Sequence, residues 1–304
     1  MNDNKIAALI FGEGDKNIKH IEKLLDLRIK ARGNILCITG KNADKAKNII
    51  ESLIESAKDE RIIDNDEVEA AIRLSENTRE IRNKSLFIKT PKKKIMPRSI
   101  QQEKYINALK KKILTFGIGP AGTGKTYIAV ADAVEKITSG LVDKIILSRP
   151  AVEAGEQLGF LPGDLKEKID PYLRPLYDAL EDCLYSDKIS KLIDRGKIEI
   201  APLAFMRGRT LASSYIILDE AQNTSSMQMK MFLTRLGKDS QMVITGDLSQ
   251  IDLPEQKKSG LLDAINVTKK LTEIEHIHFS EKDVVRHPLV TKIVKSYNER
   301  KEPR

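Results

Sequence analysis

The sequence is poor in the features that would place it in a membrane or in an oxidising compartment. Only two of its 304 residues are cysteines, Cys37 and Cys183, and they are too far apart to form a disulfide framework or a zinc site. Its apolar stretches, such as 113–118 and 215–218, are far shorter than the roughly 20 residues of a membrane-spanning helix. The first residues include charged side chains rather than the apolar run of a secretory signal. These absences predict a cytoplasmic protein with no membrane segment.

The excess positive charge is concentrated in one segment. The chain has 52 Lys and Arg against 44 Asp and Glu, a formal net charge of +8. Twelve of the basic residues, but only two of the acidic ones, lie between Arg79 and Lys112, so the remainder of the chain is slightly acidic. A basic patch suits a polyanion, and RNA bound along 79–112 is the partner we expect. A solvated linker, kept polar for solubility, is the alternative explanation of the same charges.

The basic segment also marks a domain boundary. Residues 83–98 contain two prolines and three consecutive lysines, which predicts a basic linker between a small module over 1–82 and a larger domain over 99–304. In the small module, hydrophobic patterns predict strands at 5–11, 27–31 and 35–39, a hairpin turn at 32–34, and helices that begin at Asp15, at Asn42 or Asp44, and at Asp66, the last running to about 81. We expect a small α+β module.

Beyond residue 99, short apolar runs alternate with helical segments. The runs cover residues 113–118, 144–147, 198–200, 215–218, 242–245 and 274–279. Runs of this kind are typical of parallel strands that helices cover on both faces. The sequence therefore predicts an α/β domain with a mostly parallel, doubly wound sheet, and a largely helical insertion at about 150–196.

The strongest motif is GPAGTGKT at residues 119–126, which fits the P-loop pattern G-x-x-x-x-G-K-[ST]. It follows an apolar strand and opens an amphipathic helix, so backbone N–H groups and the helix N-terminus can hold phosphates. Lys125 would reach the β- and γ-phosphates, and the Thr126 hydroxyl would bind Mg²⁺. The predicted phosphate-binding residues are Gly119, Pro120, Ala121, Gly122, Thr123, Gly124, Lys125 and Thr126.

A second motif ends the apolar run at 215–218 with two adjacent carboxylates. Ligands bind at the carboxyl ends of strands in a doubly wound sheet. Asp219 is therefore placed to hold Mg²⁺ through water, and Glu220 to orient or deprotonate the attacking water. The alternative is a strand that ends in an ordinary polar turn. A carboxylate beside the metal ligand also favours hydrolysis over kinase chemistry, in which no water is activated.

A third polar cluster, Gly246-Asp247-x-x-Gln250, follows the apolar run at 242–245. It resembles the third motif of superfamily 1 helicases, in which the glutamine senses the γ-phosphate. Gln250 would take that role here, and release of its contact on hydrolysis could move an attached loop. An ordinary strand-end loop is the alternative.

These motifs together resemble the PhoH-like family of P-loop ATPases. The resembling pieces are Gln102-x-x-Tyr105 and residues 119–126, 147–156, 158–163, 206–210, 218–223, 245–254 and 283–287. The resemblance implies a RecA-like P-loop NTPase fold, ATP as the ligand and a contact between Gln102 and the nucleotide base. It also implies a KH-like N-terminal module, although Gly12-Glu-Gly14 is one residue short of the loop with which KH domains grip RNA.

Four arginines are candidates to stabilise the transition-state charge: Arg149, Arg207, Arg209 and Arg286. Arg286 is the first choice because it lies in the last short motif, whereas Arg149, at a strand end, could instead meet nucleic acid or a phosphate. The residues after the small module suffice for only one RecA-like domain of about 200 residues. We therefore expect a ring, a hexamer, in which a neighbouring subunit supplies the arginine.

The leading hypothesis is an ATP-hydrolysing protein coupled to RNA remodelling or translocation, with RNA helicase activity as one form of it. The resemblance suggests bacterial RNA metabolism, with an rRNA-processing endoribonuclease or the ribosome as partner. The alternative is a nucleotide-dependent RNA- or ribosome-associated switch that hydrolyses ATP slowly and does no mechanical work. A small-molecule kinase is disfavoured by Glu220 and by the third motif. His276 and His278 share one face of the last predicted strand and are interpreted as structural.

Overall fold

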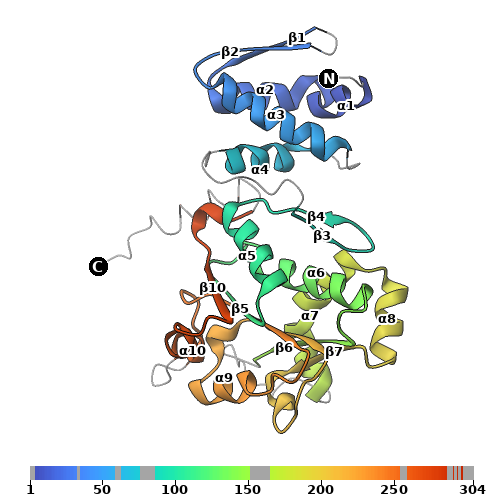
Figure 1. Ribbon diagram of the computed structural model, residues 1–304, viewed down its shortest axis with the longest axis vertical. Helices are drawn as coiled ribbons and strands as arrows, with labels where there is room; N and C mark the ends of the chain where they lie inside the picture. The colour runs from blue at the N-terminus through green and yellow to red at the C-terminus, as the bar shows by residue number, and fades with distance from the viewer. Residues whose placement is uncertain are drawn as a thin grey trace. The chain divides into compact units, whose positions relative to one another are not determined.

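A computed structural model describes residues 4–32, 35–58, 63–75, 86–150, 165–253, 259–285, 290, 293 and 296. The chain divides into two compact units, one over residues 1–84 with 98–100 and one over 85–97 with 101–304. Figure 1 traces their helices and strands along the chain. Residues 33–34 of the predicted turn at 32–34, the stretch 76–85, and the family-like stretch 151–164 lie outside the described residues, as do Pro254, Arg286 and His287.

The smaller unit combines four helices with one antiparallel hairpin. The elements are α1 (Asn4–Phe11), α2 (Lys16–Leu25), β1 (Arg28–Arg32), β2 (Ile35–Thr39), α3 (Ala43–Lys58) and α4 (Asn65–Ser75). Buried side chains of the helices, among them Ile21, Ile49, Leu53 and Val68, form its core. The predicted hairpin strands and the three predicted helices are confirmed, and the described part of the last helix ends at Ser75.

One local prediction in this unit is wrong. Residues 5–11 were expected to form a strand but belong to the helix α1, which buries Ala7 and Ile10, three residues apart, on one face. A short apolar run has no period that separates strand from helix, so the neighbouring helices decide its conformation. Asp15 precedes α2 in a left-handed conformation, φ 61°, and its side chain makes no capping hydrogen bond.

Part of the predicted linker at 83–98 is folded onto the larger unit. Strands β3 (Ile88–Lys89) and β4 (Lys94–Ile95) form a small antiparallel hairpin whose two isoleucines are buried. The backbone N–H of Lys89 donates to Glu135 Oε1 at 2.6 Å. The sequence did not reveal this pairing, because each strand carries one buried isoleucine and the residues between them are mostly lysines.

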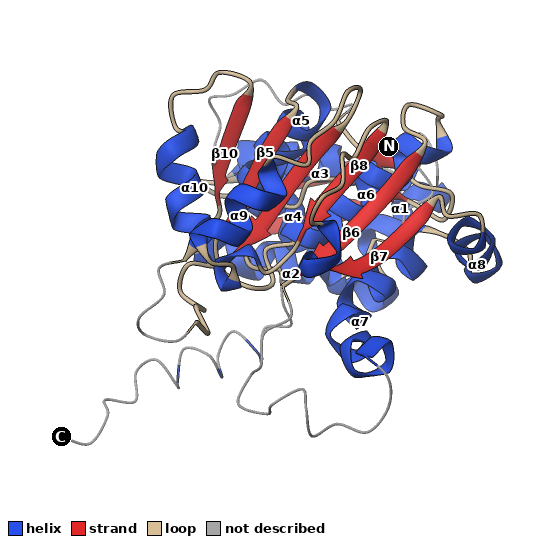
Figure 2. Cartoon of the chain, turned by 90° about the horizontal axis from the view of Figure 1, so that it is seen from below, coloured by secondary structure: helices blue, strands red, loops and turns tan. Residues whose placement is uncertain are grey.

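A six-stranded parallel sheet forms the centre of the larger unit and confirms the six predicted strands. They are β5 (Leu114–Ile118), β6 (Lys144–Arg149), β7 (Ile198–Pro202), β8 (Ser214–Leu218), β9 (Gln241–Gly246) and β10 (Ile274–His278). Their order across the sheet is β10-β5-β9-β8-β6-β7, and every neighbouring pair is parallel. Figure 2 shows these strands side by side. All six carboxyl ends therefore meet at one edge of the sheet.

Helices cover both faces of this sheet, as the apolar runs predicted. One face carries α5 (Ile100–Lys111), α6 (Lys125–Thr138), α7 (Leu165–Cys183) and α8 (Ser186–Asp194). The other carries α9 (Ser226–Leu233), α10 (Gly260–Thr268) and the short 3₁₀ helix η3 (Leu203–Met206). Alternate residues of one strand enter opposite cores: Tyr215 and Ile217 pack under α6, whereas Ile216 and Leu218 face α9. Helices α7 and α8 confirm the described part of the helical insertion.

The part of the chain that the structure describes contains no helix long and apolar enough to cross a bilayer. Within that same part, no three His, Cys, Asp or Glu side chains gather into a metal-binding group. His276 stacks on Phe116 with ring centroids 4.9 Å apart, and its Nε2 lies 2.9 Å from Thr268 Oγ1. These contacts agree with a structural role for His276.

A buried polar contact ties the sheet to α6 and provides a stability prediction. The Tyr215 hydroxyl donates to Asp132 Oδ2 at 2.7 Å, and both residues are fully buried. Tyr215→Phe leaves a buried carboxylate short of one donor, so we expect the free energy of unfolding to fall by about 1–3 kcal/mol. Urea denaturation measures this loss. Tyr185→Phe, at an exposed ring, is the control, and an equal loss in both variants would contradict the assignment.

Candidate functional site

The P-loop leaves β5 and enters α6, where the sequence predicted it. Three of its glycines have positive φ, 143° at Gly119, 82° at Gly122 and 80° at Gly124. Side chains are disfavoured in these conformations, so glycine is required for the loop to curl. At Gly119 a Cβ would also lie 2.4 Å from the carbonyl oxygen of Phe279. The sequence pattern and the packing thus specify the same loop shape.

Lys125 lies inside the curve of this loop. Its Nζ donates to the carbonyl oxygens of Gly119 at 2.6 Å and Pro120 at 2.7 Å, and lies 3.3 Å from Thr123 Oγ1. The residue is only 8% exposed, yet it lines the cavity described below. The loop therefore holds the ammonium group beside the position where P-loop proteins bind phosphate.

Gln102 lies behind the P-loop rather than in the cavity lining. It is 3% exposed, and its Nε2 donates to the Thr123 carbonyl oxygen at 3.0 Å. A Cβ added at Gly124 would lie 3.1 Å from the same nitrogen. The structure thus shows Gln102 supporting the loop, and its contact with a nucleotide base stays a prediction.

Thr126 and Asp219 are brought together by the parallel arrangement of β5 and β8. The Thr126 hydroxyl donates to Asp219 Oδ1 at 2.6 Å, and the Thr245 hydroxyl donates to the same oxygen at 2.7 Å. Mg²⁺ prefers oxygen ligands and keeps several waters, so it needs only one or two protein oxygens beside those of the phosphates. A hydroxyl and a carboxylate in contact fit that requirement, and Thr126 and Asp219 are the residues that would hold the ion.

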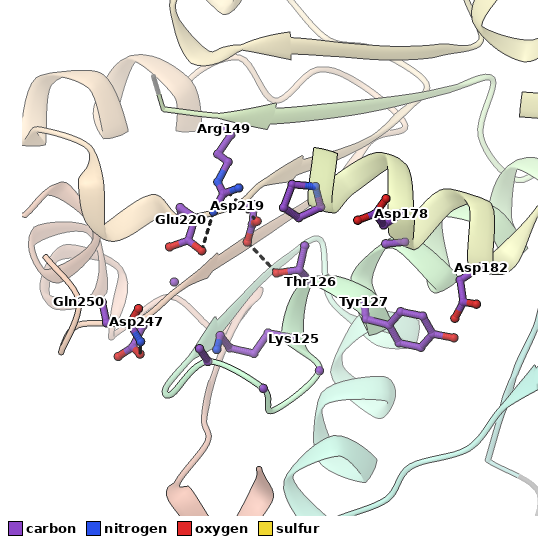
Figure 3. A pocket seen from close by; sticks show the side chains of 16 residues that line it. Lys125, Thr126, Tyr127, Arg149, Asp178, Asp182, Asp219, Glu220, Asp247 and Gln250 are labelled. Carbon is purple, nitrogen blue, oxygen red and sulfur yellow. Dashed lines mark hydrogen bonds and ion pairs between the residues drawn. The ribbon is translucent and has the colours of Figure 1, made fainter. Parts of the chain in front are cut away.

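Glu220 has both carboxylate oxygens engaged. Arg149 Nη2 lies 2.8 Å from Oε1, and Gln222 Nε2 donates to Oε2 at 2.5 Å. The backbone of Glu220 is left-handed, with φ 52°, which is uncommon for a residue other than glycine. Figure 3 shows the two adjacent carboxylates directed to different partners, that of Asp219 to Thr126 and that of Glu220 to Arg149.

Gln222 is a site residue whose role the sequence did not reveal. It is 1% exposed, and its Oε1 accepts from the backbone N–H of Asp247 at 3.0 Å. Its Nε2 donates to Glu220 and also lies 3.2 Å from the carbonyl oxygen of Gln250. A side-chain amide can donate and accept at once, so Gln222 joins the loops that follow β8 and β9. Its place in the family-like stretch 218–223, two residues after Glu220, was the only signal.

Gln250 lies at the cavity, as its proposed sensor role requires. Its Nε2 donates to Asp247 Oδ2 at 2.8 Å, while the Ser249 hydroxyl donates to Asp247 Oδ1 at 2.7 Å. Asp247 thereby fixes the turn after β9. The structure brings the third motif to the same place as the P-loop and the two carboxylates.

These residues surround a cavity of about 670 Å³, within the range of small-molecule and cofactor sites. Its two ends differ in Figure 3: Glu220, Asp247 and Gln250 lie at one end, and Tyr127 and Asp182 at the other. The P-loop and Lys125 lie between them. The cavity is lined by Ala121, Gly122, Gly124, Lys125, Thr126, Tyr127, Arg149, Pro175, Asp178, Ala179, Asp182, Asp219, Glu220, Gly246, Asp247 and Gln250.

The structure separates the four candidate arginines. Arg149 lines the cavity. Arg209 is outside the lining and pairs with both Glu199 oxygens at 2.5 and 2.8 Å, and these hydrogen bonds, together with its charge, lower the pKa of Glu199. Arg207 is exposed and also outside the lining. Arg286 lies outside the described residues.

The chain just before Arg286 reaches the P-loop. The backbone N–H of Val285 donates to the Gly122 carbonyl oxygen at 2.8 Å. The Ser280 hydroxyl and backbone N–H both bond to Asp283 Oδ2, at 2.9 and 2.8 Å, and so fix the turn that leads there. The last of the family-like motifs thus begins beside the phosphate-binding loop, which its sequence position alone did not reveal.

Two of the similarities extend over only part of the chain. The chain is 43% identical over 206 residues to Protein PhoH of Escherichia coli (strain K12), covering 67% of this chain and 58% of that protein. A Sulfolobus solfataricus SWI2/SNF2 ATPase core solved in complex with dsDNA is similar over 48% of this chain and 31% of its own, with 16% identity and a TM-score of 0.30. That superposition is too loose to support an argument, so the fold rests on the strands described above.

Similarity to other proteins extends over nearly the whole chain. The chain is 50% identical over 299 residues to the PhoH-like protein of Bacillus subtilis (strain 168), covering 96% of this chain and 94% of that protein. It is 45% identical over 301 residues to the PhoH-like protein of Mycobacterium bovis, covering 97% and 85%. The family profile described as PhoH-like protein matches residues 94–298. The chain therefore belongs to the PhoH-like family and has its nucleotide-binding P-loop.

Proposed function

We propose that this protein hydrolyses ATP with Mg²⁺ in the P-loop cavity and couples hydrolysis to RNA. The observation that carries the proposal is the convergence of Lys125, the Thr126–Asp219 pair, Glu220 and Gln250 on one cavity. These residues come from three strands and supply a phosphate site, a metal site and a base. Such a set is needed for hydrolysis rather than for nucleotide binding alone.

Each residue has a distinct part in the proposed reaction. The P-loop N–H groups and the N-terminus of α6 bind the phosphates, and Lys125 adds a positive charge beside them. Thr126 and Asp219 would hold Mg²⁺, which neutralises charge on the phosphates when it is bound. Glu220 orients the attacking water and accepts its proton, while the Gln250 amide contacts the γ-phosphate.

The direction of the nucleotide follows from the two unlike ends of the cavity. The attacking water must approach the γ-phosphate from the side of the catalytic base, Glu220. The triphosphate therefore ends near Glu220 and Gln250. The nucleoside then extends toward the end where Tyr127 and Asp178 lie (Figure 3). ATP in preference to GTP is proposed from the family resemblance and from Gln102.

The proposed RNA surface is the exposed part of the basic segment 79–112. Lys104 and Lys111, seven residues apart on α5, share one face of that helix and are exposed. Lys92 and Lys93 are instead engaged with α7, since Lys92 Nζ donates to the Glu181 carbonyl oxygen and Lys93 Nζ to Asp182 Oδ2, both at 2.5 Å. Lys104 and Lys111 are therefore better placed than Lys92 and Lys93 to bind RNA phosphates.

We further propose a hexameric ring in which a neighbouring subunit supplies an arginine to the site. Arg149 is the one arginine among the described residues that line the cavity, and it is already paired. Helicases close their nucleotide site between two domains, each built on such a sheet. The single six-stranded sheet of this protein supplies only one of the two walls. The subunits would act in bacterial RNA metabolism, with an rRNA-processing endoribonuclease or the ribosome as partner. A rate per subunit that does not change on dilution to monomer would contradict the ring.

The RNA link is tested by steady-state ATP hydrolysis with and without single-stranded RNA. We expect RNA to stimulate the wild-type rate severalfold, and the double variant Lys104→Glu and Lys111→Glu to lose most of that stimulation because each reversal repels RNA phosphates. The matched control is Lys188→Glu with Lys191→Glu, two exposed lysines on α8 outside the basic segment. Equal loss in both double variants would show a general charge effect and not a surface on α5.

The alternative function is an RNA- or ribosome-associated switch that hydrolyses ATP slowly and does no mechanical work. The carboxylate of Glu220 is held by Arg149 and Gln222, and a base that must first leave its partners favours slow hydrolysis. A slow rate that RNA does not change, with no unwinding of duplexes, would support the switch. Helicase activity requires the opposite result in both assays.

A further inference from the structure

Arg149 occupies the centre of the hydrolytic end of the site. It is the last residue of β6, it is 20% exposed in its side chain, and it lines the cavity. Its three guanidinium nitrogens have separate neighbours: Nη2 lies 2.8 Å from Glu220 Oε1, Nη1 donates to the Tyr172 carbonyl oxygen at 2.8 Å, and Nε lies 3.9 Å from Asp219 Oδ2. All three nitrogens therefore face oxygen atoms of the site or of α7.

This arrangement opposes the proposed role of Glu220. The guanidinium of Arg149 holds the Glu220 carboxylate through a charge-assisted hydrogen bond and so fixes its orientation. The second oxygen of Glu220 is also taken, by Gln222. To turn toward a water at the γ-phosphate, Glu220 must loosen at least one of these contacts.

A nucleoside triphosphate offers Arg149 a stronger partner. Its terminal phosphate carries more charge than a carboxylate and presents several oxygens in the geometry that a guanidinium binds with two parallel hydrogen bonds. The phosphate would arrive at the end of the cavity that Arg149 lines. Nη1 and Nη2 are already hydrogen-bonded and Nε faces Asp219, so a two-bond contact with the phosphate competes with the contact to Glu220.

We propose that Arg149 exchanges the Glu220 carboxylate for the γ-phosphate, so that arrival of a triphosphate, and not of a diphosphate, releases the base. Arg149 is thus a γ-phosphate ligand in its own subunit and a positioning residue for Glu220. This inference rests on the proposed ATPase function and adds a role to that site. Gln222, which contacts both Glu220 and the Gln250 loop, would then hold the released carboxylate in place.

The first test compares two ligands by calorimetry in the presence of Mg²⁺: ADP and a non-hydrolysable ATP analogue. In Arg149→Gln we expect the affinity for the analogue to fall about tenfold, the usual loss for a charge-assisted contact, while the affinity for ADP changes less than about twofold. Arg209→Gln is the matched control, an ion-paired arginine outside the cavity lining, and is expected to leave both affinities unchanged.

The second test is a double-mutant cycle with Glu220→Gln. When Arg149 is present, Glu220→Gln removes the carboxylate that the phosphate must displace from Arg149. We therefore expect Glu220→Gln to raise the affinity for the ATP analogue about fivefold more in the wild-type background than in the Arg149→Gln background. Relief of the repulsion between Glu220 and the phosphate is common to both backgrounds and cancels. The ADP affinities are expected to show no such coupling.

These measurements distinguish the proposed exchange from a purely structural role of Arg149 and from failure of the proposed ATPase function. Equal losses for ADP and the analogue, or a coupling of zero, would overturn the exchange, and melting temperatures identify a variant that has lost its anchor on α7. Arg149→Lys provides a folded, charged substitute if Arg149→Gln is unstable, and the same loss of preference for the analogue is expected. A wild-type protein that binds neither ligand would overturn the ATPase proposal and the exchange together, whereas normal hydrolysis without coupling overturns only the exchange.

Discussion

Lys125→Met is expected to reduce the rate of ATP hydrolysis by about 10³-fold, the scale of losing one preorganised charge that stabilises a transition state. The ammonium is held inside the P-loop by the carbonyl oxygens of Gly119 and Pro120, so no flexible lysine elsewhere can replace it. Methionine keeps the length of the side chain but cannot neutralise phosphate charge. We expect weaker triphosphate binding as well, because the lysine contacts the ground state too.

Phosphate release in the steady state measures the rate, and calorimetry measures the binding. The control is Lys238→Met, a lysine whose side chain is 90% exposed, for which both quantities are expected to equal those of the wild type. Hydrolysis by Lys125→Met at a rate within about tenfold of wild type would contradict a phosphate-binding role, since losses at such positions are usually far larger.

Glu220→Gln is expected to lower kcat by about 10²–10⁴-fold, the range attributed to a general base. Binding of the triphosphate is expected to be kept or strengthened, because the change removes a negative charge near the γ-phosphate and frees Arg149. A variant that binds ATP tightly and hydrolyses it slowly differs from Lys125→Met, which loses both properties. The two variants therefore separate binding from chemistry.

Single-turnover hydrolysis with saturating ATP measures the chemical step directly and avoids any contribution of product release. The comparison variant is Glu275→Gln on β10, a half-exposed glutamate outside the cavity lining. A Glu220→Gln rate close to that of this control would exclude Glu220 as the base. Asp247, which also lines the cavity, would then be the next residue to test.

Most of the larger unit could be predicted from the sequence because its strands are buried on both faces. A run such as Ile216–Leu218 contains no polar residue, and its side chains are all buried in the folded protein. Such a run is stable only as a strand covered on both faces. Residues 5–11 lacked such a constraint, and their helix depends on packing against elements distant in sequence. The hairpin at 88–95 was missed for a similar reason: two buried isoleucines hold a segment whose composition is that of a linker.

The site was predictable where a motif requires a fixed backbone geometry, as at Lys125, Thr126 and Asp219. The site was not predictable where one side chain could pair with several different partners. Arg149 was a candidate for nucleic acid, phosphate or the transition state, and only the structure shows it paired with Glu220. Gln222 gave no signal of its own, because its three contacts come from loops that meet only in the folded sheet.

The order of strands across the sheet also bears on how the protein is made. The P-loop strand β5 pairs with β9 and β10, the last two strands of the sheet in the chain. At synthesis rates of about 5–20 residues per second, β5 emerges on the order of ten seconds before β10 follows it. During that interval β5 lacks at least one of its neighbours in the sheet. We therefore expect nucleotide binding to wait until synthesis has passed β10, and a ribosome-bound fragment that stops short of it to bind nucleotide weakly.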